Sequence, residues 1–209
     1  MGLAGYRFCQ QDRIRPATGY RLPATSYQLM QLNGIFVIAT LEGDAGEQIR
    51  EINERYDPRL ARYKAPHVTI TGSSGVGPIS SSVTTVDLWE KLAPITSSTA
   101  PMTLLFAPPM RFMQTEIVVL PLDPHGPLRV FHDRLAGSGL PFGRARFTFS
   151  PHCTLTLYAT LSADAVRELL ALRVSAPAVI DRVQVVQALD PQPPRVLLEL
   201  QLTGGPEKP

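Results

Sequence analysis

The chain has 209 residues, of which 44% are hydrophobic, and this is enough apolar material for one domain with a substantial core. Its 20 basic and 18 acidic residues give a formal net charge of +2. This composition excludes a wholly disordered chain, and so small a charge excess does not indicate a basic surface for duplex DNA. There is also no run of the roughly 18 apolar residues that a membrane helix needs, and no apolar segment of a secretory signal near the start.

Residues 1–30 contain several turn-forming pairs and are interpreted as an N-terminal extension that precedes a single domain over residues 31–205. Cys9 and Cys153 fit no metal-binding or redox spacing, so we expect free thiols in a reducing cytoplasm. The oligomeric state is not readable from the sequence, and a monomer is the favoured interpretation.

The pattern becomes regular from residue 33 onward. A β-branched run at 35–39 predicts a buried strand, and residues 45–56 predict an amphipathic helix that ends at Asp57-Pro58. Alternating residues at 66–71 predict a second strand, which leads into a loop rich in Gly and Ser. A helix at 82–92 and strands at 102–106 and 116–122 complete this part of the chain.

The rest of the chain continues the alternation. Leu128, Phe131 and Leu135 form one apolar stripe, which is typical of a helix over 127–135. The remaining elements are predicted as a strand at 151–158, a helix at 163–172 and strands at 183–189 and 196–202. Strands and helices are therefore mixed throughout, which favours an α+β fold.

One short motif occurs in both halves of the chain. Pro-His-x-Thr-aliphatic-Thr stands at 66–71 and again at 151–156, about 85 residues later. This period is too long for a solenoid unit and suits a duplicated lobe that contributes one strand to a shared site. We therefore predict a bilobal α+β protein, with two pseudo-symmetric lobes of mixed or antiparallel sheet and packed helices around a central cleft.

The two motif strands are each predicted to have one apolar and one polar face, because side chains alternate along a strand. The polar face of the first carries His67, Thr69 and Thr71. On the second strand the corresponding side chains are His152, Thr154, Thr156 and Tyr158. Burying such groups without partners would cost roughly 1–3 kcal/mol each, so both faces are expected to be wet or to bind a polar ligand.

Two histidines supply a complete acid and base pair at neutral pH. In the cleavage of a phosphodiester, one imidazole of the pair His67 and His152 would take a proton from water or a hydroxyl, and the other would protonate the departing ribose oxygen. Thr69 and Thr154 would hold the non-bridging phosphate oxygens through their hydroxyl groups. This scheme requires no metal ion and no cofactor.

The paired His-x-Thr-hydrophobic motifs, at 67–70 and 152–155, resemble those of the 2H phosphoesterase superfamily, which includes the RNA 2',3'-cyclic phosphodiesterases known as 2'-5' RNA ligases. The resemblance implies two similar lobes, histidines that face each other across a groove, and catalysis without a cofactor. By the same resemblance His67, Thr69, His152 and Thr154 are the catalytic residues.

Other residues are weaker candidates for the site. Tyr158 shares the predicted face of His152 and is a candidate for stacking on a nucleobase, and Arg146 precedes the second motif at the parity of His152 and is a candidate for a phosphate contact. Cys153 is expected to be a small core residue. His125 and His132 are expected to have surface or capping roles.

These features predict a metal-independent hydrolase of a cyclic or 2',5'-linked nucleotide phosphodiester, such as a 2',3'-cyclic phosphate. Its substrate would be a small nucleotide or an RNA end, and neither duplex DNA nor a membrane is an expected partner. The alternative is a non-catalytic module of the same fold that binds nucleotides or RNA ends as a sensor or sponge. The natural substrate, and which histidine is the acid, stay open at this point.

Overall fold

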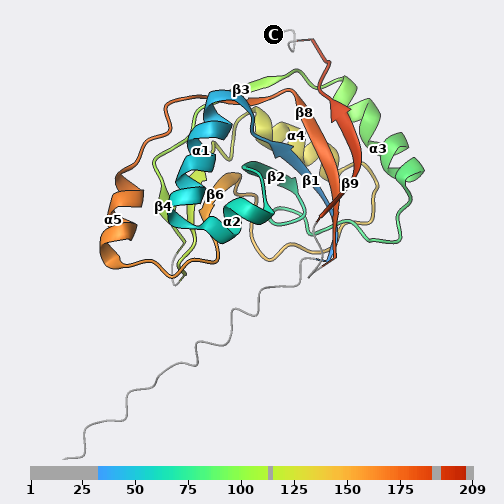
Figure 1. The fold of residues 1–209 in the computed structure, drawn as a ribbon. Helices are drawn as coiled ribbons and strands as arrows, with labels where there is room; N and C mark the ends of the chain where they lie inside the picture. Colours follow the sequence, from blue (N-terminus) through green and yellow to red (C-terminus); the bar gives the residue numbers. More distant parts are fainter. Residues whose placement is uncertain (1–32, 113–114, 190–193, 206–209) are drawn as a thin grey trace, which may run out of the picture. The chain divides into compact units, whose positions relative to one another are not determined.

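The computed structural model describes residues 33–112, 115–189 and 194–205 (Figure 1). The predicted N-terminal extension, residues 1–30, lies outside these residues. The elements in chain order are β1 (Gly34–Thr40), α1 (Gly43–Tyr56), α2 (Pro58–Tyr63), β2 (His67–Thr71), α3 (Thr85–Ser97), β3 (Met102–Leu104), β4 (Met110–Arg111), β5 (Val118–Pro121), α4 (Pro127–Ala136), β6 (His152–Thr156), α5 (Ala163–Ala171), β7 (Ala178–Ile180), β8 (Arg182–Ala188) and β9 (Arg195–Gln201). None of the described helices is long and apolar enough to cross a membrane.

A seven-stranded sheet in the order β4-β5-β6-β2-β1-β8-β9 forms the centre of the described structure, and β3 and β7 form a separate two-stranded sheet. Every strand pairing within the described residues is antiparallel. The two motif strands, β2 and β6, are neighbours in the middle of the large sheet. The α+β class is therefore confirmed, and the two halves of the chain share one continuous sheet.

The two halves are built alike around this central pair. In the first half β1 is followed by α1 and then by β2, which pairs with β1; in the second half β5 is followed by α4 and then by β6, which pairs with β5. Each helix contacts the motif strand of the other half, because α1 packs against β6 and α4 packs against β2. The repeated motif thus reflects a repeated unit, as the sequence predicts.

Asp57 separates α1 from α2 and explains why the chain breaks at this point. Its Oδ1 accepts a hydrogen bond from the Leu60 amide, which caps α2, and Pro58 stands at the first helical position, where a missing N–H costs nothing. The predicted end of the first long helix is therefore correct, but a second short helix follows directly.

The helix predicted over 82–92 lies later in the chain, as α3. Thr84 and Asp87 form a capping box that fixes its start, and the helix continues through Pro94 to Ser97. Pro94 has no backbone N–H, so one hydrogen bond of the helix is missing there. It lies in the last turn, where the loss affects little of the helix. The helix therefore extends beyond the end that the sequence predicts.

Each motif strand contains an irregularity in its pairing. Between β1 and β2, Ile38 is opposite Thr69 whereas Val37 is opposite Thr71, so Ile70 is the extra residue of a β-bulge. Between β5 and β6 the same shift makes Leu155 the extra residue. The bulges occupy equivalent positions, directly after the His-x-Thr sequence in each half.

The bulges correct one prediction made from strand alternation. Alternation places Thr71 and Thr156 on the polar face with the histidines, but both are fully buried and pair with the core residues Val37 and Val118. The Thr156 hydroxyl accepts from the Val118 amide and donates to the Glu116 carbonyl. One extra residue reverses the side on which every later side chain lies, so alternation holds only up to the bulge.

A buried side chain from the opposite half binds the carbonyl group at each bulge. Asn53 of α1 donates to the Leu155 carbonyl at 2.8 Å, and His132 of α4 contacts the Ile70 carbonyl through Nδ1 at 2.6 Å. His132 is only 2% exposed and its ring stacks on Phe149. The expected surface or capping role of His132 is therefore wrong, and the residue instead joins two halves of the core.

Candidate active site

The side chains of His67, Thr69, His152 and Thr154 lie next to one another on one face of the paired strands β2 and β6. Val68 is opposite Cys153, and because antiparallel strands run in opposite directions, His67 comes to lie opposite Thr154 and His152 opposite Thr69. Val68 and Cys153 are buried on the core face.

The catalytic candidates themselves are half-buried on the other face. The two histidines are diagonal neighbours, and such neighbours have centres roughly 7–8 Å apart. The charge of His152 acts on His67, so the two rings lie near each other.

Both imidazole rings are held by the same local contact. His67 Nδ1 lies 2.8 Å from the Ala65 carbonyl, and His152 Nδ1 lies 2.7 Å from the Ser150 carbonyl. A carbonyl oxygen only accepts hydrogen bonds, so Nδ1 carries the proton in each ring. In the neutral form this leaves Nε2 as the acceptor, and both rings are ready to take a proton there.

The surroundings favour the neutral form of both histidines. Burial lowers the pKa of His67, the positive charges of Lys64 and His152 lower it further, and the hydrogen bond to the Ala65 carbonyl opposes them. Burial also lowers the pKa of His152, against the hydrogen bond to Ser150. Protonating one ring therefore makes protonation of the other less favourable, as expected of a pair that shares one proton.

Two neighbours of the histidines were not found from the sequence. Phe112, which follows β4, contacts His152 edge to face with ring centroids 5.2 Å apart. Lys64 precedes the first motif and acts on His67 through its charge. In the sequence, Lys64 is distinguished only by the small number of lysines. Phe112 belongs to no regular pattern, and its contact with His152 is visible only in the folded structure.

Tyr158 does not extend the polar face of the second motif. Strand β6 ends at Thr156, two residues earlier, and the bulge has already reversed the alternation. The half-buried Tyr158 ring lies under the Arg59 guanidinium, 4.5 Å from it, and its amide donates to Asp57. The structure thus places this residue at the end of β6 remote from His152, and its predicted role in substrate binding stays untested.

Arg146 lies in the loop before β6 and is exposed, with its guanidinium 5.3 Å from the Phe147 ring. The argument from strand parity does not apply to it because this segment is not a strand. The loop packs against the glycine-rich segment after β2, where Gly75 donates to the Phe147 carbonyl. A phosphate contact by Arg146 stays a prediction.

Cys153 is a core residue, as expected. It is 1% exposed, and burial raises the pKa of its thiol to about 12, so it has no thiolate character at neutral pH. His125 is exposed, in agreement with a surface role. Across residues 33–112, 115–189 and 194–205, no three His, Cys, Asp or Glu side chains gather into a group that could hold a metal ion.

The antiparallel α+β fold, with one His-x-Thr motif on each of two central strands, defines a two-histidine phosphoesterase type of architecture. The profile of the 2'-5' RNA ligase superfamily matches residues 41–192, more than half of the chain. The protein therefore belongs to this superfamily, that of the 2H phosphoesterases. No curated protein matches the chain.

Solved structures share the fold at low sequence identity. A phosphoesterase is 17% identical over 82% of this chain and 98% of its own, with a TM-score of 0.54. Escherichia coli LigT, crystallised with 3'-AMP, is 16% identical over the same shares, with a TM-score of 0.54. A protein of Thermus thermophilus is 14% identical over 81% of this chain and 98% of its own, with a TM-score of 0.57. The family supports a phosphoesterase-type enzyme in general.

Proposed function

We propose that this protein hydrolyses a cyclic or 2',5'-linked nucleotide phosphodiester, such as a 2',3'-cyclic phosphate, without a metal ion, using His67 and His152 as general acid and base. The observation that carries the proposal is the register of β2 and β6, which brings both histidines and both threonines onto one face. Membership of the 2'-5' RNA ligase superfamily supports the same class of chemistry.

The acid and base roles follow from the state of the two rings. With Nδ1 bound to a carbonyl, each ring exchanges its catalytic proton at Nε2. When an anionic phosphate binds between the rings, its charge raises the pKa of both, and one of them becomes protonated. The neutral ring is then the base and the protonated ring the acid.

For a 2',3'-cyclic phosphate the reaction proceeds by in-line displacement. The base takes a proton from water as the water oxygen bonds to phosphorus, and the bond between phosphorus and one ribose oxygen breaks. The acid protonates that ribose oxygen, and the product is a ribose monophosphate on the neighbouring oxygen. Each turnover thus leaves the former base protonated and the former acid neutral, and proton exchange with solvent restores the starting state of the pair.

The threonines complete the site. Thr69 lies opposite His152 and Thr154 opposite His67, so each hydroxyl stands beside the histidine of the other half. Hydroxyl donors at these positions would bind the two non-bridging oxygens and stabilise the charge that builds up on them in the transition state. Escherichia coli LigT, which shares the fold, has been crystallised with 3'-AMP and with ATP, and this supports a small nucleotide as ligand here.

The test is hydrolysis by protein that has been treated with EDTA. The panel contains nucleoside 2',3'-cyclic monophosphates, a short RNA with a 2',3'-cyclic end and 2',5'-linked oligoadenylate, with products separated by chromatography. Turnover of at least one of them, undiminished by the chelator, supports the proposal. Binding without any product over hours would overturn it in favour of a sensor or sponge. The cytoplasmic location and the monomeric state stay predictions.

A further inference from the structure

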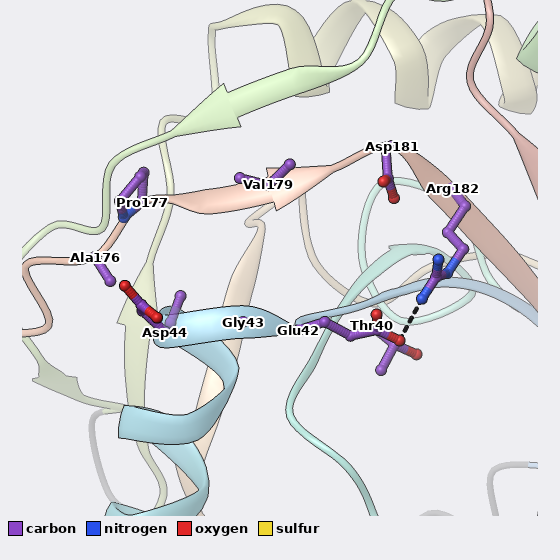
Figure 2. Close-up of a pocket in the computed structure, with 10 residues that line it drawn as sticks. Thr40, Glu42, Gly43, Asp44, Ala176, Pro177, Val179, Asp181 and Arg182 are labelled. Atoms are coloured by element: carbon purple, nitrogen blue, oxygen red, sulfur yellow. Dashed lines mark ion pairs between the residues drawn. The ribbon is translucent and has the colours of Figure 1, made fainter.

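A pocket of about 370 Å³ lies between the start of α1 and the β7–β8 connection (Figure 2). Its volume is within the range of small-molecule sites, which begins at about 300 Å³. It is lined by Thr40, Glu42, Gly43, Asp44, Ala45, Ala176, Pro177, Val179, Asp181 and Arg182. None of the four motif side chains belongs to this lining.

Thr40 connects this pocket with the catalytic face. It lines the pocket and is also the residue of β1 directly opposite His67. Side chains of directly opposed residues share one face and have Cβ atoms roughly 4.5–5.5 Å apart. A ligand whose phosphate lies between His67 of β2 and His152 of β6 therefore has to extend over β2 and β1, which are neighbouring strands about 4.8 Å apart, before it reaches the pocket.

The polar groups of the pocket are mostly hydrogen-bond acceptors. Glu42, Asp44 and Asp181 contribute carboxylates, and Arg182 is the one basic residue among the lining residues. Arg182 is already engaged, because it pairs with Glu42 and lies 4.0 Å from Glu199. The hydrogen bond and the charge of Glu42 raise the pKa of the guanidinium further.

The two remaining carboxylates are placed to receive a ligand. Figure 2 shows Asp44 at one end of the pocket, on α1, and Asp181 at the other, before β8, with Val179 and Pro177 along the wall between them. Neither carboxylate has a hydrogen bond or a close ion pair among the described residues, although the charge of Asp181 also helps to raise the pKa of Arg182. The pocket thus combines an apolar wall with acceptors at both ends, and it repels additional phosphate groups.

We infer that this pocket is the subsite for the base of the nucleotide substrate, and that it selects bases that carry an exocyclic amino group. The inference rests on the proposed function for the position of the phosphate. A carboxylate accepts N–H groups, two at once from the N1–H and 2-amino group of guanine or one from the amino group of adenine or cytosine, and the ring itself would pack on Val179 and Pro177. The substrate class is therefore a nucleotide whose base carries an exocyclic amino group and whose scissile phosphate lies at the histidine pair.

Two pairs of ligands test the inference, each pair differing only in one amino group. They are the 3'-monophosphates of guanosine and inosine, and those of adenosine and purine riboside, and their dissociation constants are measured by calorimetry. A hydrogen bond to a charged group corresponds to at least about tenfold in affinity. We expect the amino-bearing member of at least one pair to bind about tenfold more tightly than its partner.

Variants locate the preference in the pocket. Asp44→Asn and Asp181→Asn each replace one of the two acceptor oxygens of a carboxylate with a donor NH2 group. At least one of these variants should reduce the preference for the amino-bearing base to within about twofold. Glu90→Gln, on the exposed side of α3, removes a carboxylate outside the pocket and should keep the full preference.

Equal affinities within both pairs, or a preference unchanged in both pocket variants, would overturn the inference. Because the measurement is binding, it decides the question even if no substrate is hydrolysed. Loss of hydrolysis with a preserved base preference would contradict the proposed function and leave the subsite standing.

Discussion

Asn53 and His132 make equivalent contacts in opposite halves of the molecule. Each is a buried helix residue that reaches a carbonyl group at the bulge in the other half's motif strand, Asn53 at Leu155 and His132 at Ile70. Since a bulge leaves its extra residue outside the regular ladder, these carbonyls need such partners. The contacts fix the strands directly after Thr69 and Thr154, and they join the two lobes into one unit.

Removing the Asn53 amide should destabilise the protein. The variant Asn53→Ala leaves the Leu155 carbonyl buried without its donor, and we expect a loss of about 1–3 kcal/mol in the free energy of unfolding. Urea denaturation measures this value. Glu54→Ala, on the exposed side of the same helix, is the control and should change the stability by less than about 0.5 kcal/mol. Equal effects of the two variants would contradict the role assigned to Asn53.

His132 should make stability depend on pH. Burial lowers its pKa below 6.5, against the hydrogen bond to Ile70 and the charge of Asp133, while Arg129 lowers it further. The unfolded chain therefore binds a proton at a higher pH than the folded protein does. Stability should fall as the pH drops below 6.5, by at most about 1.4 kcal/mol per pH unit for this one group.

The variant His132→Gln isolates this contribution. It keeps a donor for the Ile70 carbonyl but takes up no proton. Its stability, measured by urea denaturation from pH 7.5 to 5, should fall less steeply than that of the wild type. His67 and His152 remain in both proteins and cancel in the comparison. Parallel curves would show that His132 does not contribute.

Asp57 should have the opposite dependence on pH. Although burial acts to raise its pKa, four backbone amides, of Leu157, Tyr158, Leu60 and Ala159, donate to the carboxylate, and the pKa lies below 3.8. This contribution to stability is present above 3.8 and is lost as the pH falls through the lower pKa of the folded state. Asp57→Asn should cost about 2–4 kcal/mol at pH 7. Thermal unfolding should show the difference shrinking in acid, and a constant difference would be inconsistent with the four hydrogen bonds.

Lys64 should tune the pH dependence of catalysis. Its positive charge lowers the pKa of His67, so Lys64→Met should raise that pKa and move one limb of the profile of kcat/KM to higher pH. Lys91→Met, on α3, removes the same charge elsewhere and should leave both limbs in place. The shift should shrink in high salt, because salt screens the interaction. A profile unchanged by Lys64→Met would show that the charge is not felt at His67.

Local patterns were sufficient to predict most elements and the face on which the four motif side chains lie. Alternation along β2 and β6 correctly separates Val68 and Cys153, in the core, from the histidines on the other face. Each motif lies within a single short strand, so the alternation of side chains along that strand is enough to predict which face each motif residue occupies. The duplication then indicated that the two strands belong to equivalent halves.

The features that were not predicted depend on contacts between distant parts of the chain. The bulges arise from the register with β1 and β5, and they invalidated the placement of Thr71, Thr156 and Tyr158. The buried state of His132 depends on β2 of the other half, and the contact of Phe112 with His152 depends on the short strand β4. Alternation within one strand carries no information about such partners.

The most direct test of the two-histidine account is the profile of kcat/KM against pH for the wild type, His67→Ala and His152→Ala, on the panel substrate that the wild type turns over fastest. The account predicts a bell-shaped wild-type profile, and a loss of about 100- to 10,000-fold in each variant together with one of the two limbs. Circular dichroism should show both variants folded. Retention of full activity by either folded variant would contradict the account.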